Sequence, residues 1–345
     1  MKLSDFDFDL PEELIAMHPL AARDASRMLV VNDASYGPPL PCGGGSLPGG
    51  AIQDRYFSDF ISFIRPGDVV VFNNSRVIPA RFDAGGFEIT LHTAAANNRW
   101  WGFCKKFNKL NGGDILDIDD SAKIKVIDKN DDSGILIEFL CDDVFGTLER
   151  VGKMPLPPYI KRAEESADRA RYQTVYADPL GSMAAPTAGL HFTPELISAI
   201  ENAGARVVNI TLHVGAGTWL PVKNEDLSKH KMHGEWGCIT AAQSEIINAA
   251  NRVIAIGTTS LRLLESANHQ AWCGTTDIFI TPGYKFKAVD ILLTNFHLPK
   301  STLFMLVSAF AGAPQMRAAY AHAIEQKYRF FSYGDCCLLF RNDGV

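Results

Sequence analysis

Four junctions in this chain bring hydroxyl, basic and histidine side chains together. The first spans residues 184–196. Thr193 is a suitable N-cap for a helix, and the proline that follows suits the first helical position, where no amide hydrogen is missed. Gly189 permits a backbone turn closed to other residues, and Thr187 and His191 lie beside the free amides of the helix start. Such a place can bind the carboxylate or the hydroxyls of a ligand. The alternative interpretation is a capped surface turn without a ligand.

Similar junctions recur downstream, where apolar stretches at 207–214, 253–256 and 289–294 each run into polar residues. In open α/β sheets, ligands bind beyond the carboxyl ends of the strands, where loops and helix N-termini converge. A further polar cluster follows the apolar stretch 69–72. The candidate ligand-binding residues at these places are Asn74, Arg76, Gly215, Gly217, Thr258, Thr259, Arg262, Asn295 and Lys300, accompanied by His213 and His297.

Several familiar chemistries are disfavoured by the motifs. No phosphate loop ending in Gly-Lys-Ser/Thr occurs, no Gly-x-Gly-x-x-Gly follows a predicted strand, and no Gly-x-Ser-x-Gly elbow appears. His230 and His233 have a spacing that can ligate metal, but they lack further spaced ligands, so no metal site is expected. Each junction histidine, taken singly, is either a hydrogen-bonded structural residue or a functional one.

The elements that must position these junctions alternate between strands and helices. Apolar runs predict strands at 28–31, 69–72, 207–214, 253–256, 277–280 and 289–294, and helical patterns cover 194–202, 241–252, 260–268, 301–310 and 315–328. This alternation predicts an α/β fold with a mixed, largely parallel sheet.

Residues 82–147 have a different character, with short alternating runs separated by Gly, Asn and Asp turns. Period-two strands of this kind predict a small antiparallel β-barrel. We therefore expect a discontinuous α/β catalytic domain at 1–81 and 148–345, interrupted by an inserted barrel domain at 82–147.

Composition sets further bounds. The 345 residues carry a net charge of -6, which argues against non-specific coating of nucleic acid without excluding a local basic patch. No signal peptide or membrane-spanning run occurs, so we predict a soluble cytoplasmic protein. The seven scattered cysteines are expected to be buried free thiols. The Pro/Gly-rich loop at 37–50 is interpreted as a flexible excursion, and 328–335 as a C-terminal strand with an ion pair between Arg329 and Asp335.

Two basic groups are candidates for contact with nucleic acid. One follows a tryptophan pair in the barrel segment, and the other follows a proline-rich extended segment. A solvated loop beside core aromatics is the alternative for the first group. The candidate residues are Lys105, Lys106 and Lys109 in the first group, and Lys161, Arg162, Arg169 and Arg171 in the second.

The motifs are specific enough to name a family. The chain resembles the S-adenosylmethionine:tRNA ribosyltransferase-isomerases of queuosine biosynthesis along nearly its whole length. The matching stretches include Phe-Asn-Asn-Ser-Arg-Val-Ile-Pro-Ala-Arg at 72–81, Met-Pro-Leu-Pro-Pro-Tyr-Ile at 154–160, Pro-Thr-Ala-Gly-Leu-His at 186–191 and Asn-Phe-His-Leu-Pro-Lys-Ser-Thr at 295–302, together with 1–14, 172–176, 213–218, 257–265 and 328–335.

The resemblance implies a reaction in which the ribosyl part of S-adenosylmethionine moves to 7-aminomethyl-7-deazaguanine at the wobble position of a tRNA. Isomerisation then gives epoxyqueuosine, with release of adenine and methionine. S-adenosylmethionine is thus a co-substrate, and no catalytic cofactor, metal or membrane is implied. The sulfonium acidifies the neighbouring carbon, so a base is needed, for which His191, His213, His297 and Asp290 are candidates. Arg76, Arg262 or Lys300 would hold the methionine carboxylate.

Two departures from the family pattern affect the expected tRNA contacts, namely the 37–50 loop and a shortened barrel segment at 83–113. Cys336 and Cys337 replace an expected Ala-Met pair, which indicates a change in core packing. The competing hypotheses are a tRNA-binding protein without catalysis and an ordinary methyltransferase. The polar junctions argue against the first, and the missing dinucleotide-type glycine loop argues against the second.

Overall fold

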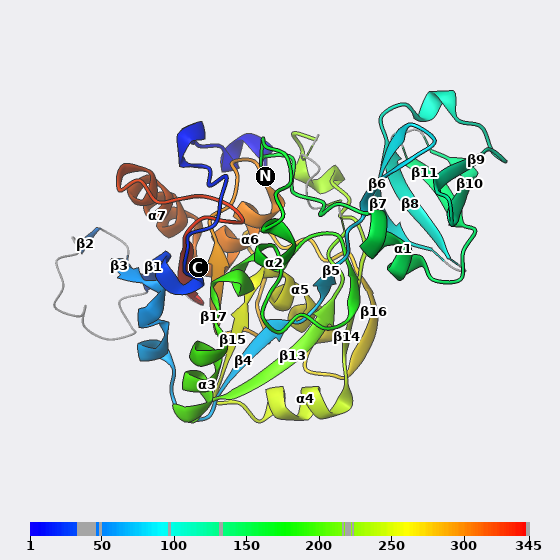
Figure 1. Ribbon diagram of the computed structural model, residues 1–345. Helices are drawn as coiled ribbons and strands as arrows, with labels where there is room; N and C mark the ends of the chain where they lie inside the picture. Colours follow the sequence, from blue (N-terminus) through cyan, green and yellow to red (C-terminus); the bar gives the residue numbers. More distant parts are fainter. Residues whose placement is uncertain are drawn as a thin grey trace.

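The computed structural model describes residues 1–32, 46–47, 50–95, 98–130, 134–215, 217, 222 and 224–342. Its larger body is built on a ten-stranded sheet with the order β16-β14-β13-β4-β15-β17-β18-β1-β3-β2 (Figure 1). The strands are β1 (Arg27–Asn32), β2 (Ser46–Leu47), β3 (Gly50–Tyr56), β4 (Asp68–Asn73), β13 (Arg206–Leu212), β14 (Glu235–Ile239), β15 (Arg252–Ile256), β16 (Trp272–Thr276), β17 (Ile291–Asn295) and β18 (Cys336–Phe340). Two short strands, β5 (Arg76–Val77) and β12 (Leu180–Ser182), form a separate parallel pair.

The sheet is mixed, and its parallel part lies at the centre. The run β13-β4-β15-β17 is parallel, and so is the β1–β18 pair. The remaining neighbours are antiparallel, at both edges and between β17 and β18. The expectation of a largely parallel sheet therefore holds for the strands that carry the polar junctions and not for the edges.

Apolar residues on both faces of the central strands explain why the sheet is covered on both sides. Every residue of β4 is buried, as a continuously apolar run predicts. Val69 and Val71 point to one core, shared with the helices α5 and α6, while Val70 and Phe72 point to the other, shared with α3. The helices are α3 (Pro194–Asn202), α4 (Ala241–Asn248), α5 (Gly257–Ala267), α6 (Thr302–Ala311) and α7 (Ala313–Glu325), with the short α2 (Asp168–Arg171).

The helix caps follow the sequence signals. The Thr193 hydroxyl accepts from the Leu196 amide at 3.2 Å, and Thr240 forms a capping box with Gln243. Helix α4 ends earlier than expected, at Asn248, and the strand predicted at 277–280 is instead β16, which ends at Thr276. Single-turn 3-10 helices occur at Leu3–Phe6 (η1), Glu12–Leu14 (η2), Arg23–Ala25 (η3), Phe107–Lys109 (η6), Thr187–His191 (η7) and Leu227–Lys229 (η9), and a longer one at Phe57–Phe63 (η5).

A second, antiparallel sheet projects from the larger body (Figure 1). Its order is β6-β7-β8-β11-β10-β9, and its inner residues, including Phe82, Trp100 and Ile137, form their own core. The Gly85 amide donates to the Asp117 carbonyl at 2.9 Å, which links the first edge to the last and makes the sheet barrel-like. The elements are β6 (Arg81–Ala84), β7 (Phe87–Ala94), β8 (Arg99–Cys104), β9 (Ile115–Asp119), β10 (Ala122–Lys129), β11 (Gly134–Phe139) and the adjoining α1 (Val144–Val151).

Two expectations about cysteines and the C-terminal segment need correction. Cys238 in β14 and Cys273 in β16 lie directly opposite each other and form a disulfide, so not all thiols are free. Residues 329–334 form a turn, and the strand begins at Cys336; Asp335 accepts the amides of Arg27 and Arg329 at 2.9 and 2.8 Å rather than a guanidinium. The 37–50 loop lies almost wholly outside the described residues.

A buried ion pair joins the amino ends of two central strands and provides a test of the fold. Asp68 in β4 is 1% exposed and accepts from Nε and Nη2 of Arg252 in β15 at 2.9 and 2.6 Å. Removing one partner leaves a buried charge unpaired, so Asp68→Ala should lower the free energy of unfolding by about 3 kcal/mol. The double variant Asp68→Ala with Arg252→Met should lose less than the sum of the single changes. Urea unfolding measures both, and a loss below about 1 kcal/mol for Asp68→Ala would contradict this account.

Candidate active site

A large concave site lies at the carboxyl ends of the central strands β15 and β17. It is a cavity of about 420 Å³, within the range of small-molecule sites. Its polar lining comes from three of the four junctions found in the sequence, and its aromatic lining from Tyr159, Tyr172 and Phe331. Of the candidate residues, those that line the cavity are Thr187, Thr258, Thr259, Arg262, Asn295, His297 and Lys300.

The start of helix α5 lines this cavity with Gly257, Thr258 and Thr259. β15 ends at Ile256 and the helix begins at once at Gly257, whose φ of 86° lies in the left-handed region that favours glycine. The N-cap residue offers no side-chain cap, so the first amides keep their hydrogen-bonding capacity. The Thr259 hydroxyl is buried and has no hydrogen-bond partner among the residues that the structure describes. Amides and a hydroxyl together, at the positive end of a helix dipole, favour a bound anion.

Arg262, one turn into α5, adds a full positive charge to the same wall. It is 3% exposed, and its Nη1 forms an ion pair with Oε2 of the equally buried Glu235 in β14. The other carboxylate oxygen of Glu235 accepts the Gly215 amide at 3.0 Å. Nε and Nη2 of Arg262 are buried and have no hydrogen-bond partner among the described residues. A buried donor without an acceptor raises the free energy of the folded protein. A carboxylate bound to these two nitrogens would supply the acceptors.

His297 is the candidate base that lines the cavity. Its Nε2 lies 3.3 Å from the Thr294 hydroxyl, and its amide donates to the Tyr320 hydroxyl at 2.9 Å. Nδ1 is buried, and no atom of the part of the chain that the structure describes is hydrogen-bonded to it. Burial lowers the pKa of His297 to about 3, so the ring is neutral at pH 7 and can accept a proton.

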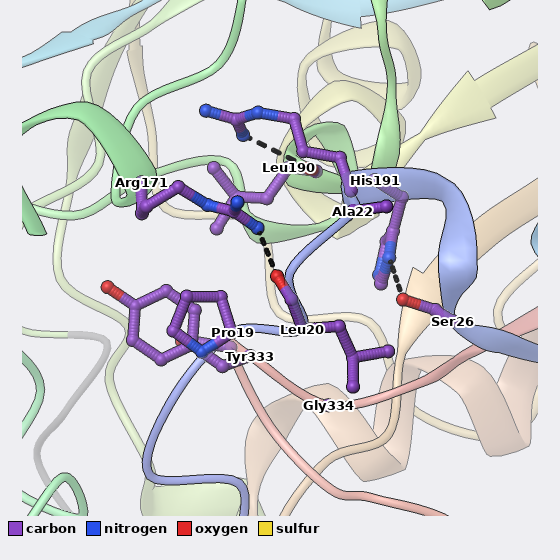
Figure 2. Close-up of a pocket in the computed structure, with 11 residues that line it drawn as sticks. Pro19, Leu20, Ala22, Ser26, Arg171, Leu190, His191, Tyr333 and Gly334 are labelled. Carbon is purple, nitrogen blue, oxygen red and sulfur yellow. Dashed lines mark hydrogen bonds between the residues drawn. The ribbon is translucent and has the colours of Figure 1, made fainter. Parts of the chain in front are cut away.

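His191 lies behind the cavity wall, in a smaller pocket (Figure 2). Its Nδ1 lies 2.9 Å from the Ser26 hydroxyl and its Nε2 lies 3.1 Å from Nδ2 of Asn295. Nδ2 of Asn295 also donates to the carbonyls of Phe331 and Asp335, which identifies it as the amide nitrogen. Nε2 of His191 therefore accepts, and Nδ1 donates to Ser26. This direction is opposite to that of a serine nucleophile with its base.

The remaining candidate bases occupy other places. His213 lies beside β12, where its Nδ1 is 2.7 Å from the Ser75 hydroxyl and its ring stacks on Trp236. Asp290 lies at the amino end of β17, the end of the strand away from the cavity. Its Oδ2 accepts the Val253 amide at 2.9 Å, and its Oδ1 lies 3.4 Å from Nη1 of Arg341. The structure therefore separates both residues from the cavity.

Gly189 has a structural reason to be glycine that differs from the predicted one. It is not among the residues with positive φ, so the predicted special turn is wrong. A Cβ there would lie 2.0 Å from the Tyr176 hydroxyl, so close packing requires glycine. Other candidates also have local roles. Oδ1 of Asn74 accepts from the Thr211 hydroxyl, Arg76 is exposed, and Lys300 at the rim pairs with Asp7 at 2.7 Å.

Gly215 and Gly217 lie outside the residues that line the cavity. The Gly215 amide is held by Glu235, as described above, and a Cβ on Gly217 would lie 2.7 Å from the ring of His233. Gly217 thus allows close approach of the chain to a neighbouring side chain, whereas a Cβ on Gly215 would meet only backbone atoms, the nearest at 3.6 Å.

The two basic groups differ in how far their side chains are free to contact nucleic acid. Lys105, Lys106 and Lys109 are exposed on the antiparallel sheet. In the second group, Arg162 binds Asp168 through two hydrogen bonds of 2.7 Å, and Arg171 donates to the carbonyls of Ala21 and Leu20 at 2.8 and 2.7 Å. Arg169 donates to the Glu149 carbonyl at 3.2 Å and also contacts the Gly152 carbonyl, while Lys161 pairs with Glu12 at 3.1 Å. Much of the second group therefore holds the chain together.

Sequence reasoning missed Glu235, Tyr159, Tyr172 and Ser332. The two tyrosines and the serine lie inside the stretches 154–160, 172–176 and 328–335 that carry the family resemblance, which was the available signal. Glu235 stands in no such stretch, and only its contact with Arg262 reveals it. Within the described ranges, no three His, Cys, Asp or Glu side chains converge as a metal ion would require, and no helix is long and apolar enough to cross a bilayer.

Known proteins similar to this chain match it along its whole length. Residues 3–339 match the family described as queuosine biosynthesis protein. Relatives from Parvibaculum lavamentivorans and Allorhizobium ampelinum, both named S-adenosylmethionine:tRNA ribosyltransferase-isomerase, are 47% and 49% identical over 99% of this chain and over 99% and 100% of their own. A solved structure of an S-adenosylmethionine tRNA ribosyltransferase from Thermotoga maritima is 31% identical, with a TM-score of 0.53, and the match covers 97% of this chain and 99% of that one. These matches confirm the resemblance predicted from the motifs.

The buried histidines predict how stability depends on pH. Burial lowers the pKa of His191 from 6.5 to about 4 and that of His297 to about 3, so below pH 6.5 the unfolded chain binds protons that the folded chain does not. Stability is therefore complete above that pH and is lost as pH falls, by about 2 kcal/mol for each histidine at pH 5. His191→Asn and His297→Asn should each reduce the difference between the unfolding free energies at pH 7.5 and pH 5. An unchanged difference in both variants would contradict the neutral, buried state.

Proposed function

The chain belongs to the queuosine biosynthesis protein family, and we propose that it is an S-adenosylmethionine:tRNA ribosyltransferase-isomerase. Its reaction transfers and isomerises the ribosyl moiety of S-adenosylmethionine onto 7-aminomethyl-7-deazaguanine at the wobble position of tRNA. The product is epoxyqueuosine-tRNA, and adenine and methionine are released. Relatives that carry this enzyme name over their full length support the reaction. No further cofactor takes part in the proposal.

The observation that carries the proposal at the site is the buried guanidinium of Arg262 beside the start of α5. Its two nitrogens without partners and the free amides of the helix form a carboxylate site in the cavity wall. The methionine carboxylate of S-adenosylmethionine fits this chemistry. Of the three cations named from the sequence, Arg262 is preferred because Arg76 is exposed and Lys300 is paired with Asp7.

His297 is the proposed base among the four sequence candidates, because it lines the cavity with Nδ1 free. The sulfonium of S-adenosylmethionine acidifies the adjacent ribose carbon. Removal of a proton from that carbon by Nδ1 gives a sulfonium ylide and an imidazolium. The electron pair of the ylide forms a double bond to the adjoining ring carbon as the bond from that carbon to the ring oxygen breaks. The electrons of the ring oxygen then form a carbonyl at the anomeric carbon, and adenine leaves from that carbon. A neutral imidazole is the form that accepts the proton, and burial maintains it.

Aromatic rings offer a surface for a nucleobase. Tyr159 and Phe331 lie with ring centroids 4.3 Å apart and planes at 32°, and both line the cavity. The Tyr159 hydroxyl is fixed by Ser332 at 2.5 Å, while the Tyr172 hydroxyl is buried without a partner. The aromatic rings can stack on a base, and the nearby hydroxyls can form hydrogen bonds with its edge. Both interactions fit adenine or the modified deazaguanine.

The tRNA partner is proposed to reach beyond the cavity to the antiparallel sheet. We take residues 82–147 as an inserted domain within a catalytic domain formed by 1–81 and 148–345. The exposed Lys105, Lys106 and Lys109 are its candidate phosphate contacts. A cytoplasmic location follows from a tRNA substrate, and the proposal includes it.

The test of the proposed function is to measure the reaction products of the wild-type protein and of two histidine variants. The protein incubated with S-adenosylmethionine and tRNA bearing 7-aminomethyl-7-deazaguanine should release adenine and methionine, and only with the modified tRNA. His297→Asn should lower kcat by about 100-fold or more, because general-base catalysis contributes that much. The control His322→Asn, on α7 and away from the cavity, should retain the rate.

Other outcomes would discriminate the alternatives. S-adenosylhomocysteine in place of adenine would indicate a methyltransferase, and tight tRNA binding without any product would indicate an inactive binder. Full activity in a folded His297→Asn variant would remove that residue from the mechanism.

A further inference from the structure

A second, smaller pocket lies on the other side of the cavity wall (Figure 2). Ser332 lines both spaces, and Asn295, which lines the cavity, is hydrogen-bonded to His191 of the pocket. The pocket measures about 20 Å³, enough for one group the size of a water oxygen. Its polar lining is Arg23, Ser26, Arg171, His191, Ser332 and Tyr333.

Two arginines give this pocket a positive charge that no lining carboxylate balances. Nη1 and Nη2 of Arg23 donate to the carbonyls of Leu190 and Ala170 at 3.1 and 2.9 Å. The two Nη atoms of Arg171 donate to the carbonyls of Ala21 and Leu20. Figure 2 shows the bond to Leu20. Burial and the nearby Arg171 both lower the pKa of Arg23. Carbonyl dipoles fix both guanidiniums in place but leave their charges uncompensated.

Two carboxylates adjoin the lining residues Tyr333 and Gly334, and both already have partners. Asp168 binds Arg162 through two hydrogen bonds and also accepts from the Tyr333 hydroxyl at 2.9 Å. Asp335 accepts two backbone amides, of Arg27 and Arg329. Neither carboxylate therefore neutralises Arg23 or Arg171.

Donors without acceptors at this pocket favour an anionic ligand. Nε of Arg171 is buried and has no acceptor within the described ranges. Because Nδ1 of His191 donates to Ser26, the hydroxyl hydrogen of Ser26 is left to donate elsewhere. The site thus offers guanidinium and hydroxyl donors around a space that holds one oxygen atom.

We propose that this pocket binds an oxygen of a phosphodiester of the RNA substrate, at a phosphate next to the nucleotide whose base enters the cavity. The inference rests on the proposed tRNA reaction. The small volume admits an oxygen and excludes a base, and guanidiniums are the preferred partners of phosphate. The shared wall of Asn295 and Ser332 places the phosphate beside the base, where such contacts fix the register of the nucleic acid.

The test is a double-mutant cycle between protein and RNA. Anticodon stem–loops bearing 7-aminomethyl-7-deazaguanine carry a neutral methylphosphonate either 5′ or 3′ of that nucleotide. With the wild-type protein, the methylphosphonate at one of these two positions should raise the KM for RNA about tenfold relative to the unmodified stem–loop. With Arg171→Gln, the methylphosphonate at that position should raise the KM by less than about twofold. Arg171→Gln should itself raise the KM for RNA about tenfold, reduce the slope of log affinity against log salt by about 1, and leave the KM for S-adenosylmethionine unchanged.

Controls separate this effect from loss of charge and loss of folding. Arg206→Gln removes the same charge from an exposed site at the amino end of β13, and should leave both the KM for RNA and the methylphosphonate effect as in wild type. Thermal unfolding reports on folding. If Arg171→Gln does not fold, Arg23→Gln carries the same cycle, and Arg171→Lys, which retains the charge, should recover part of the RNA affinity.

The outcomes that overturn the inference are distinct from those that overturn the proposed function. Additive effects of the methylphosphonate and Arg171→Gln, with an active enzyme, would overturn the inference alone. So would a raised KM for S-adenosylmethionine, or inhibition by inorganic phosphate that Arg171→Gln abolishes while the cycle stays additive, since the pocket would then bind free phosphate. A wild-type protein that releases no adenine with any modified RNA would overturn the proposed function and this inference with it.

Discussion

The arrangement of the site depends on the burial of one charged side chain, the guanidinium of Arg262. A buried charge is tolerated only when it is paired and hydrogen-bonded, and here Glu235 supplies the partner. Helix α5 and strand β14 must therefore pack closely. Gly237 permits this, because a Cβ at that position would lie 2.8 Å from a methyl group of Leu263 in α5. The same carboxylate fixes the Gly215 amide, so three separate segments are held by one ion pair.

The parallel strands at the centre of the sheet determine where chemistry can occur. The carboxyl ends of β15 and β17 lie at the cavity. At the other end of the sheet, the ladder between the two strands is extended by the hydrogen bond from the Val253 amide to the Asp290 carboxylate. Asn295 at the end of β17 lies between two spaces with different linings. On one side lie the aromatic rings, His297 and Arg262, and on the other the arginine pocket. The proposed ligands of these spaces are the carboxylate and the nucleobase on the first side and the phosphate on the second.

Local signals in the sequence predicted local structure well. Thr193 and Thr240 identified helix starts, and the valine-rich run of β4 identified a central strand. The edges of the sheet were harder, because the pairing of β14 with β16 joins segments without a continuous apolar run, and the disulfide between Cys238 and Cys273 depends on that pairing. The residue type alone also could not show that the roles of Arg262 and Arg162 differ. Arg262 lines the cavity, whereas Arg162 forms an ion pair with Asp168. The difference lies in contacts between distant segments.

Recognition of the methionine carboxylate by Arg262 is the central claim, and a binding cycle tests it most directly. Calorimetry would compare S-adenosylmethionine with an analogue whose carboxylate is replaced by a neutral amide, for wild-type protein and for Arg262→Gln. The wild-type protein should bind the amide about 10- to 100-fold more weakly, as expected for a charge-assisted hydrogen bond, and Arg262→Gln should bind both ligands with similar affinity. An equal loss of affinity for the amide in both proteins would contradict the account and place the carboxylate elsewhere.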